Sequence, residues 1–92
     1  MIGSIRHKAL RRYWTQGQSR GLNAEWIRKL RRILSALEAA ERPEDMNYPG
    51  SHFHALKGDR FGRYAVRLTA NYRVTFGWAE DSAMDVDIED YH

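Results

Sequence analysis

The sequence predicts an α+β fold in which two N-terminal helices pack on one side of a small antiparallel β-sheet. Two observations lead to this prediction. Apolar residues recur at helical spacing through residues 24–40, and from residue 63 onward apolar and polar residues alternate, which is the period of a half-buried strand. The 92 residues are expected to form one domain, residues 1–92, because so short a chain must gather most of its large apolar side chains into a single core.

The first helix is predicted over residues 7–16. Leu10 and Trp14 fall on the same side of this helix, and Gly17 is a natural C-terminal stop, since glycine adopts the left-handed conformation at little cost. Two isoleucines within residues 1–5 favour a short opening strand before the helix.

The longest helical signal covers residues 24–40. Asn23 is a suitable N-cap, because its side-chain oxygen can accept a hydrogen bond from a free backbone N–H of the first turn. The apolar positions recur every three or four residues and form one stripe, made of Ile27, Leu30, Ile33, Leu34 and Leu37. The other side carries a basic ridge, made of Arg28, Lys29, Arg31 and Arg32. This ridge is either a solvated helix face or a surface for a nucleic acid.

The second half of the chain predicts a four-stranded sheet. Three strands alternate clearly, at residues 63–68, 72–78 and 84–88, and a fourth is expected at residues 53–56. In the last of the three, the apolar set is Met84, Val86 and Ile88. Turns are expected near residues 69–71 and 79–82. If the apolar side chains face the helices, Arg63, Arg67 and Arg73 line the opposite face of the sheet.

Positive charge is concentrated in the first half of the chain. Residues 1–42 carry ten Lys and Arg against three Asp and Glu, whereas residues 43–92 carry five against nine. Twelve of the fifteen cations are arginine, which binds phosphate through two parallel hydrogen bonds and stacks on bases. A polyanion such as a nucleic acid is therefore an expected partner, and a solvated charged face is the alternative.

Composition also excludes several classes of protein. Without cysteine, the chain has no disulfide framework and no thiolate zinc site, which fits a reducing compartment. The apolar runs are too short to span a bilayer, and basic residues are scattered through residues 1–15, where a signal peptide would be hydrophobic. We therefore expect a cytoplasmic protein with no membrane partner.

Two stretches carry ionisable groups suited to acid–base chemistry. The last three residues are Asp90, Tyr91 and His92. The stretch of residues 52–58 contains a second set, which includes His54 and Lys57. Imidazoles have a pKa near neutrality and can both accept and donate protons in reactions on anionic substrates. We expect these two stretches to meet in the folded protein.

Four motifs follow one another along the chain: Ile-Arg-His-Lys-Ala-Leu-Arg-Arg at 5–12, His-x-Leu-Lys-Gly at 54–58, Asn-Tyr-Arg-Val-Thr-Phe at 71–76 and Asp-Val-Asp-x-Glu-Asp-Tyr-His at 85–92. Together with the long basic helix, they resemble the HigB toxins, the killer branch of the RelE superfamily, over nearly the whole chain. The resemblance implies a RelE-like microbial RNase fold and a bacterial toxin that enters the ribosome and cleaves messenger RNA in the decoding site. It also implies a HigA-like antitoxin of helix-turn-helix type that holds the toxin inactive, with DNA bound only indirectly through the antitoxin.

The resemblance assigns roles to individual residues. Metal-independent RNA cleavage uses the 2′-hydroxyl as nucleophile, so the protein must take a proton from it, donate one to the leaving 5′-oxygen and stabilise the charge between them. By analogy, His54 and His92 take the two proton-transfer roles, and which is base and which is acid is left open. The other expected catalytic groups are Lys57, Asp90 and Tyr91, and the expected substrate-binding groups are Arg60, Arg63 and Arg73.

Several of these groups have a specific expected task. Lys57 and Arg73 would hold the scissile phosphate, and Asp90 would orient a histidine or raise its pKa. Tyr91 would stack on a base or donate a hydrogen bond to phosphate. The basic ridge would contact ribosomal RNA, and the chemistry requires no metal and no cofactor.

Two alternatives involve different chemistry. His52 and His54 would point to the same side of a strand, as would Asp90 and His92, so these four groups could ligate a metal ion. Three nearby cations, Lys57, Arg60 and Arg63, would repel a bound metal ion, and no metal site is predicted. The other alternative is a non-catalytic basic module that binds RNA or DNA and leaves it intact, in which His54 is an ordinary strand histidine.

Overall fold

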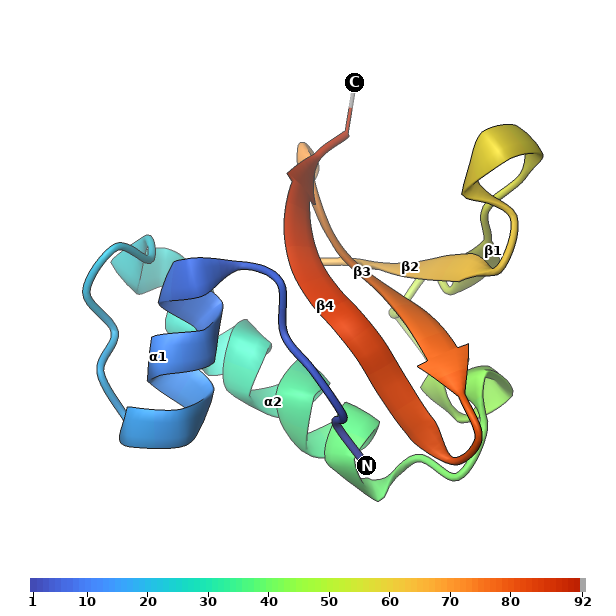
Figure 1. Cartoon of the computed structure of the whole chain (residues 1–92). Helices are drawn as coiled ribbons and strands as arrows, with labels where there is room; N and C mark the ends of the chain where they lie inside the picture. Colours follow the sequence, from blue (N-terminus) through green and yellow to red (C-terminus); the bar gives the residue numbers. More distant parts are fainter. Residues whose placement is uncertain (92) are drawn as a thin grey trace.

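A four-stranded antiparallel sheet forms one layer of the protein and two α-helices form the other, as the sequence predicts (Figure 1). The computed structural model describes residues 1–91, and His92 lies outside the described residues. The strands pair in the order of the sequence and are β1 (His54–Ala55), β2 (Arg63–Arg67), β3 (Tyr72–Ala79) and β4 (Ser82–Asp90). The helical elements are α1 (Lys8–Gln16) and α2 (Ile27–Ala39), with three 3₁₀ turns, η1 (Ala24–Trp26), η2 (Pro43–Met46) and η3 (Gly58–Arg60). Within residues 1–91, no helix has the length and apolar character needed to cross a membrane.

Local capping explains where the helices begin and end. His7 is the N-cap of α1, where its Nδ1 accepts a hydrogen bond from the N–H of Leu10 at 3.1 Å, and Gly17 ends the helix with a left-handed φ of 73°. Asn23 accepts from the backbone N–H two residues later at 2.9 Å, but it caps η1 rather than α2 itself. The helix predicted over residues 24–40 is thus a 3₁₀ turn followed by a shorter α-helix, since 3₁₀ turns frequently open α-helices.

Two predicted strands are shorter than the sequence indicates. β1 has only two residues, although a strand is predicted over 53–56, because the chain just before it turns through a left-handed residue, His52, with a φ of 52°. The opening segment is not a continuous strand either. Only Ile2 and Ile5 pair with β4, as isolated parallel bridges. The segment therefore lies along the outer side of β4 without becoming a fifth strand.

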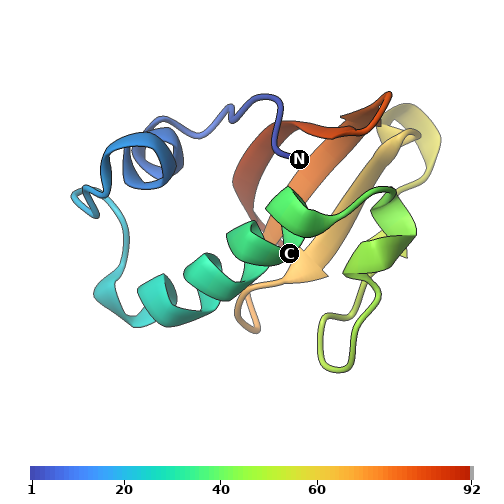
Figure 2. The ribbon, with the colours of Figure 1, turned by 90° about the horizontal axis from the view of Figure 1, so that it is seen from below.

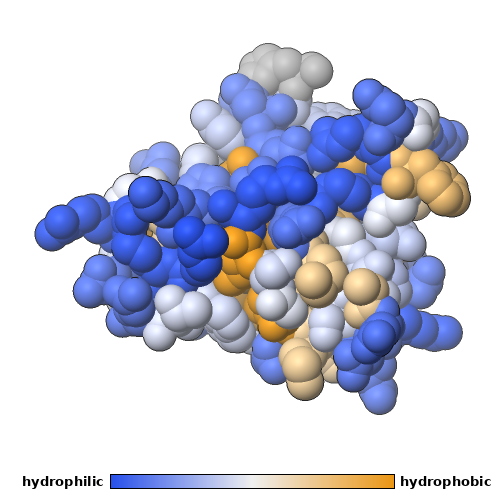
Figure 3. Space-filling model, viewed as in Figure 1, coloured by the Kyte–Doolittle hydropathy of each residue, from blue (hydrophilic) through white to orange (hydrophobic). Residues whose placement is uncertain are grey.

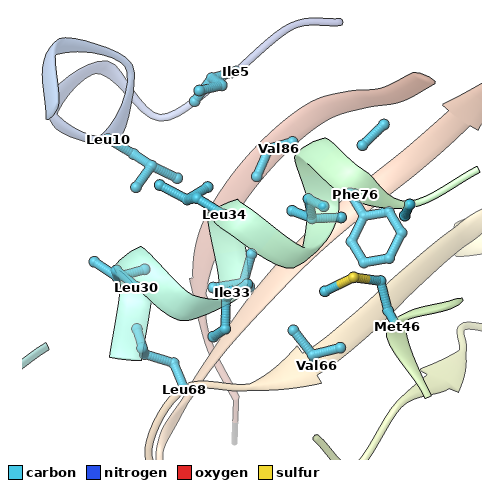
Figure 4. Packing of buried hydrophobic residues seen from close by; sticks show 14 residues of the cluster. Ile5, Leu10, Leu30, Ile33, Leu34, Met46, Val66, Leu68, Phe76 and Val86 are labelled. Atoms are coloured by element: carbon cyan, nitrogen blue, oxygen red, sulfur yellow. The ribbon is translucent and has the colours of Figure 1, made fainter. Parts of the chain in front are cut away.

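The hydrophobic core lies between the sheet and α2, which crosses the sheet in the view of Figure 2. In Figure 4, Leu34 of α2 lies beside Val86 of β4, and Met46 lies between Phe76 and Val66. All five side chains are completely buried. The stripe that predicts α2 is therefore the surface that packs on the sheet.

β4 departs from the strict alternation that the sequence suggests. A register shift separates the pairs that β3 makes through Thr75 and through Gly77, so two residues of β4 lie opposite one residue of β3. This β-bulge coincides with a left-handed residue, Asp85, which has a φ of 50°. As a result Ala83, rather than the expected Met84, is fully buried in the core.

The strand register leaves the second face of the sheet outside the core. Val74 faces the helices, so its neighbour Arg73 and the paired Arg67 face the other way, as predicted. We call this side the open face. In Figure 1, η3 and the C-terminal end of β4 both rise on the side away from the two helices. Figure 3 shows mostly hydrophilic side chains around this upper part, with an apolar spot at the upper right near η3. A larger apolar patch lies below, where the N-terminal segment runs beside β4.

Replacing Leu34 with alanine is expected to lower the free energy of unfolding by about 2–5 kcal/mol, because the truncated side chain leaves a cavity among fully buried neighbours. Urea unfolding followed by circular dichroism measures this change. The control is Ser35→Ala, at an exposed position of the same helix, with an expected change within about 0.5 kcal/mol. A cost for Leu34→Ala as small as that of the control would contradict this packing.

Candidate active site on the open face of the sheet

The open face carries polar side chains from all four strands. The register aligns one row across the sheet, made of His54, Ala65, Thr75 and Asp87. The next row, nearer the C-terminal end of β4, is made of Arg67, Arg73 and Glu89. Directly paired residues share a face and lie within reach of one another, so the two rows form one polar surface.

Tyr91 connects the C-terminal stretch to His54. The guanidinium carbon of Arg73 lies 4.3 Å from the centroid of the Tyr91 ring, which is a cation–π contact. The His54 ring meets the same tyrosine edge to face, with 6.2 Å between ring centroids. Tyr91 is held in place by its backbone N–H, which donates to the carbonyl of Asn71 at 2.6 Å. The two stretches expected to meet therefore do meet, through these rings.

The ring orientation of His54 follows from a backbone contact. Its Nδ1 lies 3.1 Å from the carbonyl oxygen of His52. A carbonyl oxygen only accepts, so this hydrogen bond requires the proton on Nδ1 and leaves the Nε2 lone pair of the neutral ring available. His54 can thus accept a proton at Nε2.

The alternative metal site is not assembled as the sequence suggested. His52 precedes β1 and has a left-handed φ, so it does not share a strand face with His54. Within residues 1–91, no three His, Cys, Asp or Glu side chains converge in a group that could hold a metal ion. His92, the remaining member of the suggested set, lies outside the described residues.

Arg73 is fixed by its own turn. Its Nη1 donates to the carbonyl oxygens of Thr69 at 2.8 Å and Tyr72 at 3.1 Å, which ties the guanidinium to the β2–β3 turn under Tyr91. The Nε atoms of Arg73 and Arg63 are buried and have no hydrogen-bond partner among residues 1–91. Each of these two guanidinium groups therefore has one buried N–H donor that no acceptor of residues 1–91 satisfies.

A second polar network spans the open face beside this cluster. Arg60, in η3, donates from Nη2 to Oε2 of Glu89 in β4 at 2.7 Å, so the turn is anchored to the far side of the sheet. The Thr75 hydroxyl donates to the same carboxylate oxygen. Arg63 donates from Nη2 to the Thr75 hydroxyl at 3.1 Å and to the Asp85 carbonyl at 2.9 Å. Two of the predicted substrate-binding arginines are therefore held by partners within the protein.

The surroundings of Glu89 keep its carboxyl group ionised. Partial burial opposes ionisation, but hydrogen bonds from Thr75 and Arg60, together with the charges of Arg60 and Arg63, outweigh it and lower the pKa of Glu89. For Arg63, burial is the main cause of a lowered pKa. The charge of Arg6 lowers the pKa of Arg63 further, whereas the charge of Glu89 raises it. Arginine nevertheless stays protonated, so the network holds two cations around one anion.

Sequence reasoning did not single out Thr75 or Glu89. Thr75 is only 3% exposed, which is unusual for a polar residue. Its buried hydroxyl lies at the centre of the network, where Arg63 and Glu89 satisfy its hydrogen bonds. The available signal was the alternation itself, since it places both residues on the polar face of their strands. Their contact could not be read from it, because it depends on the register between β3 and β4.

Two further predicted catalytic groups, Lys57 and Asp90, lie within the described residues. Lys57 is exposed and precedes η3, just after β1. Asp90 pairs with Tyr72, whose side chain packs against the core, so the register places Asp90 on the opposite side of β4 from Glu89. His92 lies outside the described residues.

The basic ridge of α2 does not present four equivalent side chains. Arg31 donates from Nε to the Tyr13 hydroxyl at 3.3 Å, which ties it to α1. Lys29 is partly buried, and this burial, followed by the nearby charges of Arg67, Arg32 and Arg73, lowers its pKa. Lys29 and Arg32 therefore lie toward the sheet, whereas Arg31 lies toward α1.

The fold indicates the class of protein, because two helices against a four-stranded antiparallel sheet are consistent with the RelE-like toxin fold. Residues 3–92 match the family of RelE-like toxins of the type II toxin-antitoxin system HigB, and the chain belongs to this family. The resemblance inferred from the sequence motifs is confirmed.

Two relatives carry the same family name. Over 92 residues, which cover 100% of both proteins, the chain is 33% identical to Endoribonuclease HigB of Proteus vulgaris. It is 30% identical over 59 residues to Toxin HigB-1 of Vibrio cholerae serotype O1, a match that covers 63% of this chain and 62% of that toxin.

Glu89→Gln should reduce stability most at neutral pH. Because the pKa of Glu89 is lowered in the folded state, its carboxylate stabilises the fold above the ordinary glutamate range, about pH 4.3, and this contribution is lost as the pH falls through the lower folded-state value. Urea unfolding at neutral and acidic pH measures the difference between wild type and variant. The control is Asp87→Asn, which removes a carboxylate from the same strand that forms no ion pair within residues 1–91. A Glu89→Gln difference that persists unchanged at acidic pH would contradict this account.

Proposed function

We propose that this protein is the endoribonuclease toxin of a type II toxin-antitoxin system, which cleaves translated messenger RNA in the decoding site of the ribosome and arrests growth. The observation that carries the proposal is the cluster in which His54 and Arg73 both contact Tyr91. The relative from Proteus vulgaris, which matches over the whole chain, is named an endoribonuclease and supports the activity. The chemistry needs only side chains, and the toxin acts in the cytoplasm, where ribosomes translate.

The proposed reaction is a transesterification within the RNA. A base takes the proton of the 2′-hydroxyl, the 2′-oxygen bonds to phosphorus, the bond to the 5′-oxygen breaks, and an acid gives that oxygen a proton. His54 suits the base, because its Nδ1 contact with the His52 carbonyl leaves Nε2 free to accept a proton. His92 is assigned the acid from the family resemblance, with Asp90 two residues earlier to orient it or to favour its charged form.

The negative charge that develops at phosphorus requires fixed donors. Arg73 is tied to its turn and stacked on Tyr91, so it can hold the scissile phosphate without ordering a mobile side chain. Lys57 is exposed on the segment after β1 and supplies a second cation. Arg60 and Arg63 contribute positive potential to the substrate surface while bound to Glu89 and Thr75. Tyr91 is half exposed and can stack on a base beside the reacting phosphate.

The proposed partners follow from the same surfaces. The basic ridge of α2, made of Arg28, Lys29, Arg31 and Arg32, contacts ribosomal RNA through phosphates. A HigA-like antitoxin of helix-turn-helix type binds the toxin, and DNA is reached only through that antitoxin. The competing function is a non-catalytic basic module, which would bind RNA and leave it intact.

His54→Ala should abolish growth arrest and reduce cleavage by about 10²–10⁴-fold, the usual contribution of a positioned proton acceptor. Induced expression in a bacterium, with growth and the 5′ ends of cellular messages measured in one culture, tests this in cells. Toxin treated with EDTA and exchanged into chelator-free buffer, then added to purified ribosomes with a defined message, tests whether the toxin needs a bound metal of its own. The control is His52→Asn, which removes the neighbouring imidazole at an exposed position and keeps a residue type that tolerates a positive φ. Cleavage by a folded His54→Ala protein at the wild-type rate would exclude the assignment.

Tyr91→Phe and Tyr91→Ala should separate the roles of the ring and the hydroxyl. Phenylalanine keeps the contacts with Arg73 and His54, whereas alanine removes both. A cation–π contact contributes about 0.5–2 kcal/mol, so Tyr91→Ala should cleave about 2–30-fold more slowly than Tyr91→Phe. Single-turnover cleavage on programmed ribosomes measures both rates. Equal rates for the two variants would show that the ring does not position Arg73.

A further inference from the structure

A pocket of about 200 Å³ lies on the side of α2 that faces the loop after η2. Its lining consists of Lys29, Arg32, Ile33, Tyr48, Pro49 and Gly50. The space is large enough for a phosphate group and part of its sugar. It is enclosed by two cationic side chains, by the phenol of a partly buried tyrosine and by one apolar wall. Pockets of this kind fix a ligand by a few polar groups on an apolar frame.

The charges in this pocket are not balanced from within the protein. Neither Lys29 nor Arg32 forms an ion pair with a carboxylate of residues 1–91. Burial and the positive charges of Arg67, Arg32 and Arg73 lower the pKa of Lys29, which places four cations in one neighbourhood. An anion would relieve this repulsion and supply the missing partner.

The pocket lies near the end of β2, where Arg67 is on the open face. The backbone N–H of Arg67 donates to the carbonyl of Ser51 at 2.8 Å, so the loop that carries Tyr48 is tied to the end of β2. The chain then reaches His54 six residues after Tyr48, a separation of at most about 20 Å. The positive charge of Arg73 also acts on Lys29, and the guanidinium group of Arg73 lies on the Tyr91 ring.

We propose that this pocket binds a backbone phosphate of the same single RNA strand whose scissile phosphate lies on the open face. Lys29 and Arg32 hold this phosphate, in place of the ribosomal RNA contact assigned to them as members of the basic ridge, and Tyr48 completes the wall. The inference rests on the proposed function, because it takes the open face as the place of cleavage. Arginine and lysine supply the donors that phosphate needs, and the charges of two open-face cations, Arg67 and Arg73, act on Lys29. An acidic segment of the antitoxin is the competing occupant, but binding of such a segment would not require cations of the open face close to the pocket.

The site should act on every message alike. Phosphate contacts fix register and carry no sequence information, so removal of the pocket's cations should weaken binding uniformly and leave the choice of cleavage sites unchanged. For each phosphate that the protein no longer neutralises, the salt dependence of single-strand binding should flatten by about 0.7 in the logarithmic slope.

Amide NMR spectra of the full chain test the proposal directly. The His54→Ala protein keeps the RNA intact during the measurement, and the probe is a short single-stranded oligoribonucleotide. We expect its addition to shift the amide signals of Tyr48 and Gly50 together with those of the open face. In the Lys29→Gln/Arg32→Gln form of the same protein, the affinity should fall at least tenfold and the shifts at Tyr48 and Gly50 should disappear. The matched control is Lys8→Gln/Arg20→Gln, which removes two positive charges from exposed positions outside the pocket and should leave the affinity within about twofold.

Three results would overturn the inference. The first is an oligoribonucleotide that shifts the open face and leaves Tyr48 and Gly50 unchanged. The second is an equal loss of affinity in the pocket variant and its control, which would indicate net charge alone. The third is RNA binding that is unaffected while affinity for the antitoxin falls, which would assign the pocket to the antitoxin. Failure of the proposed function has a different signature, because oligoribonucleotide binding at the pocket would persist while His54→Ala still cleaved messages at the wild-type rate.

Discussion

The pairing of β4 with β3 is the constraint on which the candidate site depends. It sets Arg73 opposite Glu89 on the open face while the alternate pairs face the core. A shift of one residue would exchange the two faces, so the buried apolar residues also fix the polar arrangement. The pairing continues past the end of β4 through the N–H of Tyr91 and the carbonyl of Asn71, and this hydrogen bond brings the Tyr91 ring to Arg73. Core packing and the position of Tyr91 are thus consequences of one register.

The network around Glu89 gives the open face its second support. The Arg60–Glu89 ion pair is partly buried, with side-chain exposures of 42% and 29%, and it joins residues 29 positions apart in sequence. A pair of this kind contributes little net stability by itself, but it specifies where the η3 turn lies relative to β4. That turn directly follows Lys57, so the same ion pair limits where Lys57 can be. The structure therefore uses one carboxylate to position the cations around it.

Local physical chemistry predicted the parts of this protein that depend on neighbours in sequence. Periodicity gave α2 and the faces of β2 and β3, and the capping roles of Gly17 and Asn23 follow from short-range hydrogen bonds and φ preferences. The shared acid–base character of residues 52–58 and 90–92 predicted that the two stretches meet, but no local rule predicts the particular contact between His54 and Tyr91. The bulge at Asp85 escaped prediction for a related reason. An extra residue in one strand is visible only against its partner strand, and the alternation of the sequence alone therefore assigned Met84 to the core.

The acidic run in β4 poses an electrostatic problem for the proposed RNA-binding surface, and the fold provides partners for two of its carboxylates, Asp85 and Glu89. The bulge turns the Asp85 side chain to the N-terminal segment, where its carboxylate lies 3.7 Å from Arg6 and its Oδ1 accepts from the Ser4 hydroxyl. Glu89 stays on the open face, but it is paired with Arg60 and accepts from Thr75, so its charge is compensated where it lies. Because the charges of Asp85 and Glu89 are compensated, the cations of the open face, including Arg73, set the electrostatic potential that a phosphate would meet. The strand can thus carry Asp85 and Glu89 close to the proposed site for a polyanion, because each of these carboxylates has a fixed partner before the substrate arrives.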